Sequence, residues 1–148
     1  MDDAKIHEIR QWLVKAKHDL GSARRLMEGE EPFLDTAVYH CQQAAEKALK
    51  AYLTLQDAPF EKIHDLTVLI EQCSGFNEGF KELLGYSEIL TPYATAFRYP
   101  GDVLEPARPD AEEAAGLAER IVEFVIQKMP EEVKPDLPRQ ASRKNQTS

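Results

Sequence analysis

Apolar residues recur at steps of three and four along most of this sequence, and no stretch sustains the strict alternation of a β-strand. Such spacing gathers apolar side chains on one face of an α-helix, and that face must then be buried against other helices. The first stripe consists of Ile6, Ile9, Leu13, Ala16, Leu20, Ala23 and Met27. The second consists of Leu34, Val38, Cys41, Ala45, Ala48, Tyr52 and Leu55. These stripes predict two long helices that form an antiparallel hairpin.

Shorter helical stretches follow this pair. Residues 64–66, His-Asp-Leu, predict a helix start with Asp65 as its N-cap, and Gly75 predicts the end of that helix. A later stretch steps toward Arg98, and within it Pro92 predicts either the start of a helix or a kink.

The end of the chain contains one more helical stripe, within residues 111–129. Asp110 comes just before this stripe, and Glu113 follows three residues later, which is the spacing of a capping box. Residues 130–148 are polar, contain three prolines and lack aromatic residues, which predicts a disordered tail. The sequence therefore predicts an all-α protein, an up-down helical bundle of four to five helices within residues 1–129.

The balance of charge narrows the class of partner. The 148 residues fit a single domain, with 18 basic and 26 acidic side chains, a net charge of -8 and a pI near 5.0. Because a long polyanion is bound through a surplus of Lys and Arg, we expect no binding to duplex DNA.

Cysteine usage and hydropathy indicate the compartment. Cys41 and Cys73 lie in apolar helical patterns and are too few for a disulfide framework, so we expect them buried and reduced. No apolar run approaches the roughly 20 residues of a membrane span. The opening Met-Asp-Asp lacks the basic and then apolar pattern of a signal peptide. We therefore expect a cytoplasmic protein without membrane contact.

The common motifs of catalysis and cofactor binding are missing. Glu61 and His64 form one Glu-x-x-His pair, whereas a di-iron site in a helical bundle uses two such pairs. The chain has no Gly-x-Ser-x-Gly nucleophile elbow and no glycine-rich phosphate loop. We therefore expect neither a metal nor a cofactor.

Three polar features remain: residues 39–50 in the second predicted helix, residues 64–66, and residues 98–100. Each has a structural and a functional interpretation. Gln42, Glu46 and Lys50 recur every four residues, which is typical of a solvated helix face with local ion pairing. In the structural interpretation, Arg98 forms an interhelical salt bridge, for example with Glu46, and Tyr99 covers the core as a lid. Structural ion pairs outnumber functional ones, which favours this interpretation.

In the functional interpretation, Arg98, Lys47 and His64 converge on a phosphate group, with an aromatic ring near a nucleobase. The sequence alone leaves both interpretations open.

Taken together and in this order, these features resemble the HEPN domain family, whose name stands for higher eukaryotes and prokaryotes nucleotide-binding. The resemblance runs from residue 5 to about residue 129. In the first helix it is carried by Trp12, Ala16, Asp19, Leu20 and Ala23. It continues through residues 41–50 (Cys-Gln-Gln-Ala-Ala-Glu-Lys-Ala-Leu-Lys) and residues 64–66, and it closes with Tyr93 and Arg98-Tyr99-Pro100.

This resemblance implies a four- to five-helix bundle that forms homodimers. Small prokaryotic members of the Arg-Tyr-Pro type often pair with a minimal nucleotidyltransferase, in two-component or toxin–antitoxin systems. The resemblance also implies a site for a nucleotide or its phosphate. The candidate binding residues in this sequence are Arg98, Tyr99, His64, Lys47 and Gln43.

Other branches of the family are metal-independent endoribonucleases, in which an Arg is followed after four to six residues by a His. This chain departs from that signature, because no His follows Arg98 and the last histidine is His64. We therefore interpret the protein as a binding module that dimerises and associates with a nucleotidyltransferase partner, a nucleotide or an RNA end. The alternatives are a ribonuclease in which His64 or His40 lies close to Arg98, and a purely structural interaction domain.

Overall fold

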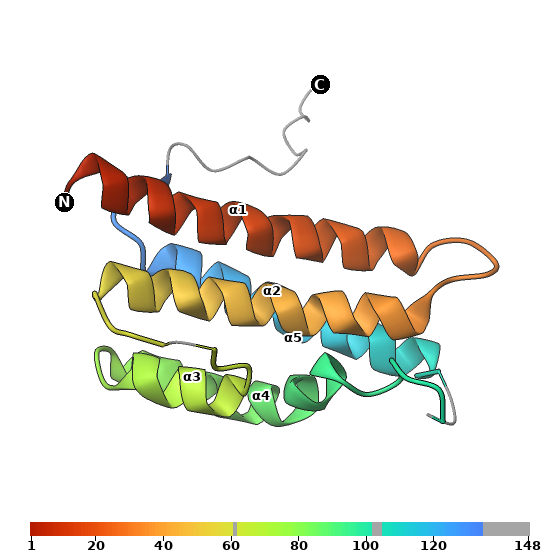
Figure 1. The fold of residues 1–148 in the computed structure, drawn as a ribbon. Helices are drawn as coiled ribbons and strands as arrows, with labels where there is room; N and C mark the ends of the chain where they lie inside the picture. The colour runs from red at the N-terminus through yellow and green to blue at the C-terminus, as the bar shows by residue number, and fades with distance from the viewer. Residues whose placement is uncertain (61, 102–104, 135–148) are drawn as a thin grey trace, which may run out of the picture.

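The structure, a computed structural model, describes residues 1–60, 62–101 and 105–134. Within these ranges every regular element is helical, as predicted (Figure 1). The α-helices are α1 (Asp3–Leu26), α2 (Leu34–Leu55), α3 (Leu66–Ser74), α4 (Leu84–Leu90) and α5 (Arg108–Gln127). Two 3-10 helices, η1 (Glu78–Leu83) and η2 (Thr91–Ala94), flank α4.

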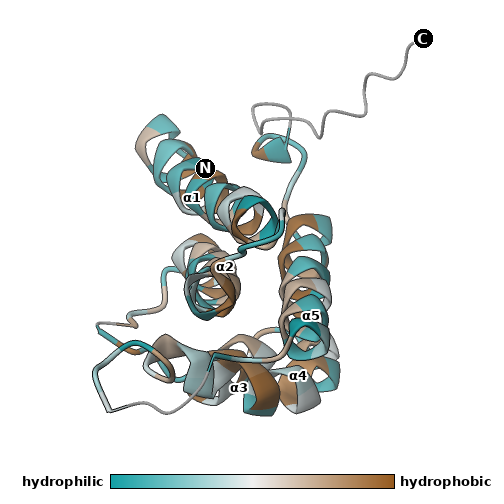
Figure 2. Cartoon of the chain, turned by 90° about the vertical axis from the view of Figure 1, so that its right-hand side faces the viewer, coloured by the Kyte–Doolittle hydropathy of each residue, from teal (hydrophilic) through white to brown (hydrophobic). Residues whose placement is uncertain are grey.

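Helix α2 occupies the centre of the molecule. Figure 2 shows it end-on, with α1, α5 and the layer of α3 and α4 arranged around it. Fifteen of its 22 residues are buried, and these include the small side chains of Ala37, Ala44 and Ala51. Small side chains let neighbouring helices approach α2 closely, which is why one helix can be covered on several sides. The predicted antiparallel hairpin of α1 and α2 is confirmed.

The turn before Arg98 differs from a regular helix. Helix α4 ends at Leu90, and Pro92 lies in the 3-10 helix η2 that follows. Proline lacks the N–H that would continue an α-helical ladder, so the chain tightens there. The segment then leaves the helical direction before it reaches Arg98.

The start of the last helix corrects one prediction. Helix α5 begins at Arg108 with Ala107 as its N-cap, and no side chain caps it. Asp110 therefore lies inside the first turn, and the predicted capping box with Glu113 is wrong. Pro109 explains the earlier start, because its fixed φ favours the first helical positions.

The chain beyond α5 packs against α1. Val133 is fully buried, and its carbonyl oxygen accepts a hydrogen bond of 3.1 Å from Arg10 Nε. Arg10 also donates to the carbonyl of Glu132. The packed body thus continues to residue 134, past the predicted boundary at residue 129, and the remainder of the predicted tail lies outside the described residues.

Both cysteines are free and buried, as predicted. Burial raises the pKa of each thiol to about 12, so both are protonated at neutral pH. None of the helices in the described ranges is long and apolar enough to span a bilayer.

Candidate functional site

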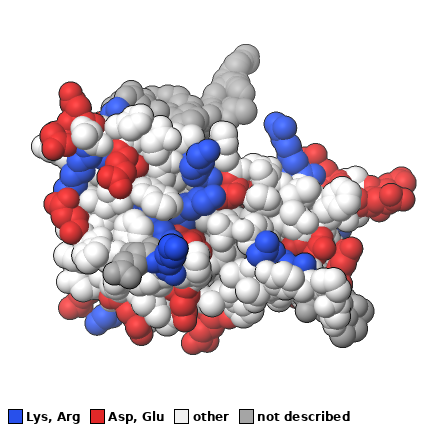
Figure 3. Space-filling model, viewed as in Figure 1, with Lys and Arg blue, Asp and Glu red and all other residues white. Residues whose placement is uncertain are grey.

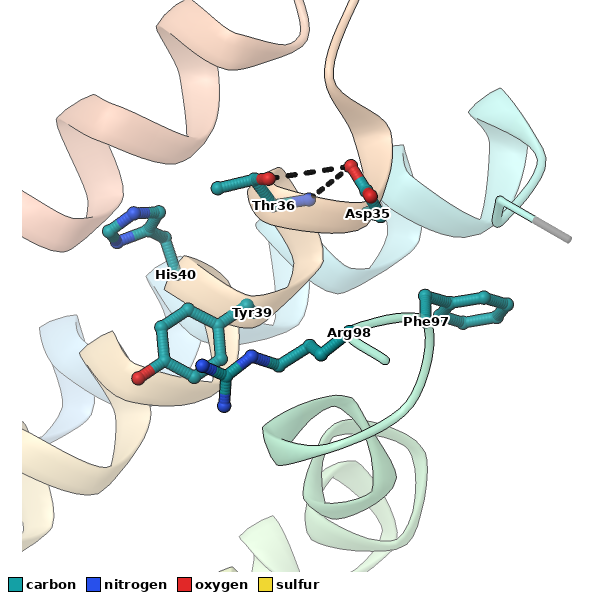
Figure 4. A pocket seen from close by; sticks show the side chains of 6 residues that line it. All are labelled: Asp35, Thr36, Tyr39, His40, Phe97 and Arg98. Atoms are coloured by element: carbon teal, nitrogen blue, oxygen red, sulfur yellow. Dashed lines mark hydrogen bonds between the residues drawn. The ribbon is translucent and has the colours of Figure 1, made fainter. Parts of the chain in front are cut away.

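A pocket of about 270 Å³ lies where the start of α2 meets the segment after η2 (Figure 4). Residues 35, 36, 39 and 40 come from α2, whose 3.6-residue turn brings this spacing onto one face. Phe97 and Arg98 come from the segment after η2. The pocket therefore joins parts of the chain that are about 60 residues apart in sequence.

Arg98 provides the positive charge of the pocket. Its guanidinium carbon lies 4.1 Å from the centre of the Tyr39 ring and 5.7 Å from that of Tyr99. One guanidinium nitrogen donates a 3.0 Å hydrogen bond to the carbonyl oxygen of Ala94. Across the described ranges no carboxylate pairs with Arg98. The side chain is exposed, so these contacts orient the guanidinium without neutralising its charge.

Phe97 adopts a backbone conformation that an aromatic residue rarely takes. Its φ of 69° lies in the left-handed region, where the Cβ atom crowds the backbone at a cost of roughly 1–2 kcal/mol. The ring packs 6.2 Å from that of Tyr93, and in Figure 4 it points away from Arg98. The reversal at Phe97 turns the chain so that Arg98 lies over Tyr39. Strain of this kind is characteristic of functional sites.

A buried carboxylate holds the histidine of the pocket. Asp19 of α1 lies 2.8 Å from His40 Nδ1, and it accepts a 2.7 Å hydrogen bond from Lys47 Nζ. Asp19 is only 7% exposed; Lys47 balances its charge, and His40 is a further hydrogen-bonding partner. With Nδ1 bound to a carboxylate, the ring of His40 is fixed in orientation, and Nε2 is left for other partners.

Asp35 and Thr36 form the edge of the pocket at the first turn of α2. Asp35 Oδ1 accepts a 2.7 Å hydrogen bond from the Thr36 backbone N–H and a longer one of 3.4 Å from its hydroxyl. Phe33, the N-cap residue, provides no side-chain bond to the helix. The N-terminal end of α2, with its partial positive charge, therefore faces the pocket region.

A second polar cluster lies further along α2. Glu46 is 4% exposed and accepts hydrogen bonds from Lys50 Nζ at 2.9 Å and Gln42 Nε2 at 3.1 Å. His64 Nδ1 lies 3.0 Å from the same carboxylate, and Gln43 Nε2 lies 3.4 Å from it. Burial alone would raise the pKa of Glu46, but these hydrogen bonds outweigh it and the pKa is lowered.

Two structural interpretations are corrected by this arrangement. Gln42, Glu46 and Lys50 are all buried, so they do not form a solvated face. Other parts of the chain contact them. Lys50 Nζ lies 5.9 Å from the Trp12 ring centre and 5.6 Å from that of Phe60, and His64 bonds to Gln42 and Glu46. The predicted salt bridge between Arg98 and Glu46 is wrong, because Lys50 pairs with Glu46.

Tyr99 does not serve as a lid on the core. Its side chain is 59% exposed and lies beside Arg98. The ring is therefore accessible from solvent next to the guanidinium.

The predicted binding residues fall into separate groups. Arg98 and Tyr99 lie together, and Lys47 is linked to the pocket through Asp19 and His40. His64 and Gln43 belong to the Glu46 cluster instead. Tyr39 and Glu46 are seven residues apart on α2, which separates the two groups by about 10 Å along the axis.

Apart from His40, which the ribonuclease alternative named, the sequence analysis did not identify the other members of the pocket, although part of the signal was available. Asp35, Thr36, Tyr39 and His40 recur at helical spacing in the second predicted helix, which indicates a polar face. Nothing in the local sequence indicates that Asp19 meets His40, because that contact depends on how α1 and α2 pack.

The site offers little to a metal ion. Among the described residues, no group of three or more His, Cys, Asp or Glu side chains is arranged to hold one. Glu61 of the Glu-x-x-His pair lies outside the described residues. What the pocket offers is an oriented guanidinium, a fixed imidazole, a hydroxyl and a carboxylate, which are the groups that recognise phosphates and sugar hydroxyls.

Fold and site together define a helical-bundle protein with a polar pocket at one end of its central helix. The HEPN domain model matches residues 9–132 of the chain, so the protein belongs to the HEPN domain family.

Solved structures agree with this membership. TT1696 from Thermus thermophilus is 28% identical with a TM-score of 0.71, and the match covers 82% of this chain and 98% of that one. ST0689, an archaeal HEPN homologue, is 27% identical with a TM-score of 0.63, and the match covers 81% of this chain and 96% of that one. A HEPN domain protein (tm0613) from Thermotoga maritima is 25% identical with a TM-score of 0.55, and the match covers 84% of this chain and 96% of that one. Among curated proteins, no match was found.

Proposed function

We propose that this HEPN protein is a binding module that holds the phosphate of a nucleotide or RNA end in the Arg98 pocket. The observation that carries the proposal is the guanidinium of Arg98, which lies over Tyr39 without a carboxylate partner in the described ranges. Guanidinium groups bind phosphate oxygens through paired hydrogen bonds. Three cations on α1 and α2 are already paired with carboxylates: Lys47 with Asp19, Lys50 with Glu46, and Arg24 with Glu119.

Two further features support a phosphate ligand. His40 lines the pocket, with its ring held by Asp19. The exposed ring of Tyr99 lies beside the guanidinium, where a nucleobase can stack on it.

A thermal-shift scan tests this function. The full chain is heated with ATP, GTP, CTP, UTP or a short single-stranded RNA, with and without Mg²⁺. A ligand at 100 times its Kd adds about 2.7 kcal/mol, which raises the Tm by several degrees. We expect at least one ligand to raise the Tm, and Arg98→Ala to abolish the shift while the variant remains folded.

Arg25→Ala is the matched control, because Arg25 is exposed on α1 and does not line the pocket. Its ligand response should equal that of the wild type. A shift that survives in Arg98→Ala, or the absence of a shift with every ligand, contradicts the proposal.

We also propose that the protein works as a homodimer together with a minimal nucleotidyltransferase. The support comes from family membership and from exposed apolar side chains near the pocket, where Phe33 is 62% exposed and Tyr99 59%. Light scattering after gel filtration tests the dimer. Co-expression with a nucleotidyltransferase encoded beside the gene, followed by co-purification, tests the partner.

A second candidate function is metal-independent RNA cleavage. The observation that favours it is that His40, held by Asp19, lines the same pocket as Arg98. His40 would accept the proton of the ribose 2′-hydroxyl as that oxygen bonds to the adjacent phosphorus. The P–O5′ bond breaks, the 5′-oxygen leaves with a proton from water, and Arg98 stabilises the charge on the phosphate. Cleavage of a labelled RNA in EDTA that is lost in both His40→Ala and Arg98→Ala, but retained in His64→Ala, would establish it.

A further inference from the structure

Asp35 is the residue of the pocket that a phosphate site does not explain. A carboxylate beside the phosphate-binding arginine repels an anionic ligand and lowers its affinity. The side chain nevertheless lines the pocket, and Figure 4 shows it with Thr36 on the edge opposite Arg98. Besides its bond to the Thr36 N–H, this carboxylate suits a hydrogen-bond donor of the ligand rather than the phosphate.

The local hydrogen bonds fix Asp35 and leave one oxygen available. Both bonds from Thr36 go to Oδ1, at 2.7 Å from the backbone nitrogen and 3.4 Å from the hydroxyl. Oδ2 accepts no hydrogen bond from any described residue. The bonds to Oδ1 hold the carboxylate in position, so Oδ2 is an acceptor available to a ligand.

From this arrangement we infer that the pocket takes a ribonucleotide and that Asp35 accepts hydrogen bonds from its ribose hydroxyls. The inference rests on the proposed function, because it requires the phosphate to occupy Arg98. In a nucleotide, the 2′- and 3′-hydroxyls are the donors nearest the phosphate, and a carboxylate is the acceptor that proteins use for them. The Thr36 hydroxyl adds a second polar group beside Asp35. The pocket, at about 270 Å³, is small enough to enclose only one nucleotide unit.

The test compares ribose with deoxyribose on an otherwise identical ligand. The full chain, labelled with ¹⁵N, is titrated with the 5′-monophosphates of the four ribonucleosides and with their 2′-deoxy and 3′-deoxy forms, followed by amide shifts. We expect the best ribonucleotide to bind about tenfold more tightly than its deoxy forms, the loss expected for one charge-assisted hydrogen bond.

Variants separate this inference from the proposed function. Asp35→Asn should reduce the preference for ribose to less than twofold, while deoxy forms bind at least as well because the repulsion is gone. Glu31→Gln is the matched control, since Glu31 is an exposed acidic residue near the start of α2 that does not line the pocket, and it should keep the full preference. Arg98→Ala should weaken every nucleotide.

Each other outcome has a definite meaning. Nucleotides that bind through Arg98 with equal affinity for ribose and deoxyribose overturn the inference and leave the proposed function standing. A preference for ribose that persists in Asp35→Asn also overturns it. No binding of any monophosphate to the wild type overturns both.

Discussion

At the scale of single residues, the buried charged side chains of the described ranges are two carboxylates, Asp19 and Glu46, and the ammonium of Lys50. Asp19 and Glu46 are each less than a tenth exposed, and each is surrounded by a lysine and a histidine from the chain. A buried carboxylate is tolerated when its hydrogen bonds replace the lost water. The Asp19 group orients His40 in the pocket, whereas the Glu46 group joins α2 to the start of α3.

Glu46→Gln should destabilise the protein by about 3 kcal/mol at pH 7, because Lys50 stays buried without its counter-charge. The double variant Glu46→Met with Lys50→Met should lose less unfolding free energy than the single variant Glu46→Gln, since no unpaired charge remains. Urea unfolding of the wild type, both variants and the exposed-site control Glu123→Gln measures the differences. Equal stability of Glu46→Gln and wild type would contradict the assignment.

The difference in unfolding free energy between the wild type and Glu46→Gln should also depend on pH. The folded-state pKa of Glu46 is lowered, so ionised Glu46 stabilises the fold above its ordinary pKa of 4.5. This stabilisation is lost as the pH falls below 4.5 and through the lowered pKa. The gap between wild type and Glu46→Gln should therefore shrink steadily from about pH 5 down to acid unfolding. A gap that stays constant would mean that the carboxylate charge contributes nothing.

The buried thiols give a second prediction at this scale. The pKa of Cys41 and Cys73 is raised to about 12 by burial, so the thiolate that reacts with disulfide reagents is scarce at neutral pH. Both thiols should react with a colorimetric disulfide reagent only after unfolding in urea. Rapid reaction of one thiol with the native protein would show that its helix opens locally.

At the scale of elements, the end of α2 illustrates how a helix is terminated without glycine. Asp57 has a φ of 57°. The Ala58 N–H bonds to the Leu53 carbonyl at 2.9 Å and the Asp57 N–H to the Thr54 carbonyl at 3.1 Å. These two bonds form a Schellman motif, in which glycine is the residue without strain at the left-handed position.

Asp57→Gly should therefore stabilise the protein by about 0.5–1 kcal/mol. The lost ion pair with Lys5 offsets little of this gain, because the Asp57 side chain is 78% exposed. Asp57→Ala is the control that removes the same ion pair but keeps the strain, and it should not stabilise. Thermal unfolding of the two variants at equal ionic strength makes the comparison, and a less stable glycine variant would refute the strain argument.

Elements also show where sequence reasoning succeeds and where it stops. The periodic stripes predict α1 and α2, and residues 64–66 with Gly75 predict α3, whose Asp65 cap is confirmed by its 2.9 Å bond from the Thr67 N–H. Local patterns could not predict that Gln42, Glu46 and Lys50 are buried, because the residues that contact them come from other parts of the chain: Trp12 and Phe60 lie against Lys50, and His64 bonds to Gln42 and Glu46. For the same reason, the pocket could only be predicted in part: the turn at Phe97 and the Asp19–His40 contact both depend on tertiary packing.

At the scale of the whole molecule, charge is dispersed. Figure 3 shows acidic and basic side chains spread over the face in view, in keeping with a net charge of -8. An anionic polymer is therefore repelled by most of the protein and attracted at the Arg98 pocket. Binding to nucleic acid should involve one phosphate.

A salt titration checks this consequence. For a short single-stranded RNA, the logarithm of the binding constant should fall with the logarithm of the salt concentration at a slope of about −0.7, the value for a single phosphate contact. Fluorescence anisotropy at several salt concentrations measures the slope. A slope several times steeper would mean that a broader basic surface takes part.

The central claim is that a nucleotide phosphate occupies the Arg98 pocket, and a map of amide shifts tests it most directly. The ¹⁵N-labelled chain is titrated with the ribonucleoside monophosphate that binds best. The account predicts that the largest shifts fall at the start of α2, residues 34–40, and in residues 94–101, and that Arg98→Ala abolishes them. Shifts centred on Glu46 and His64, or unchanged spectra at saturating ligand, would contradict it.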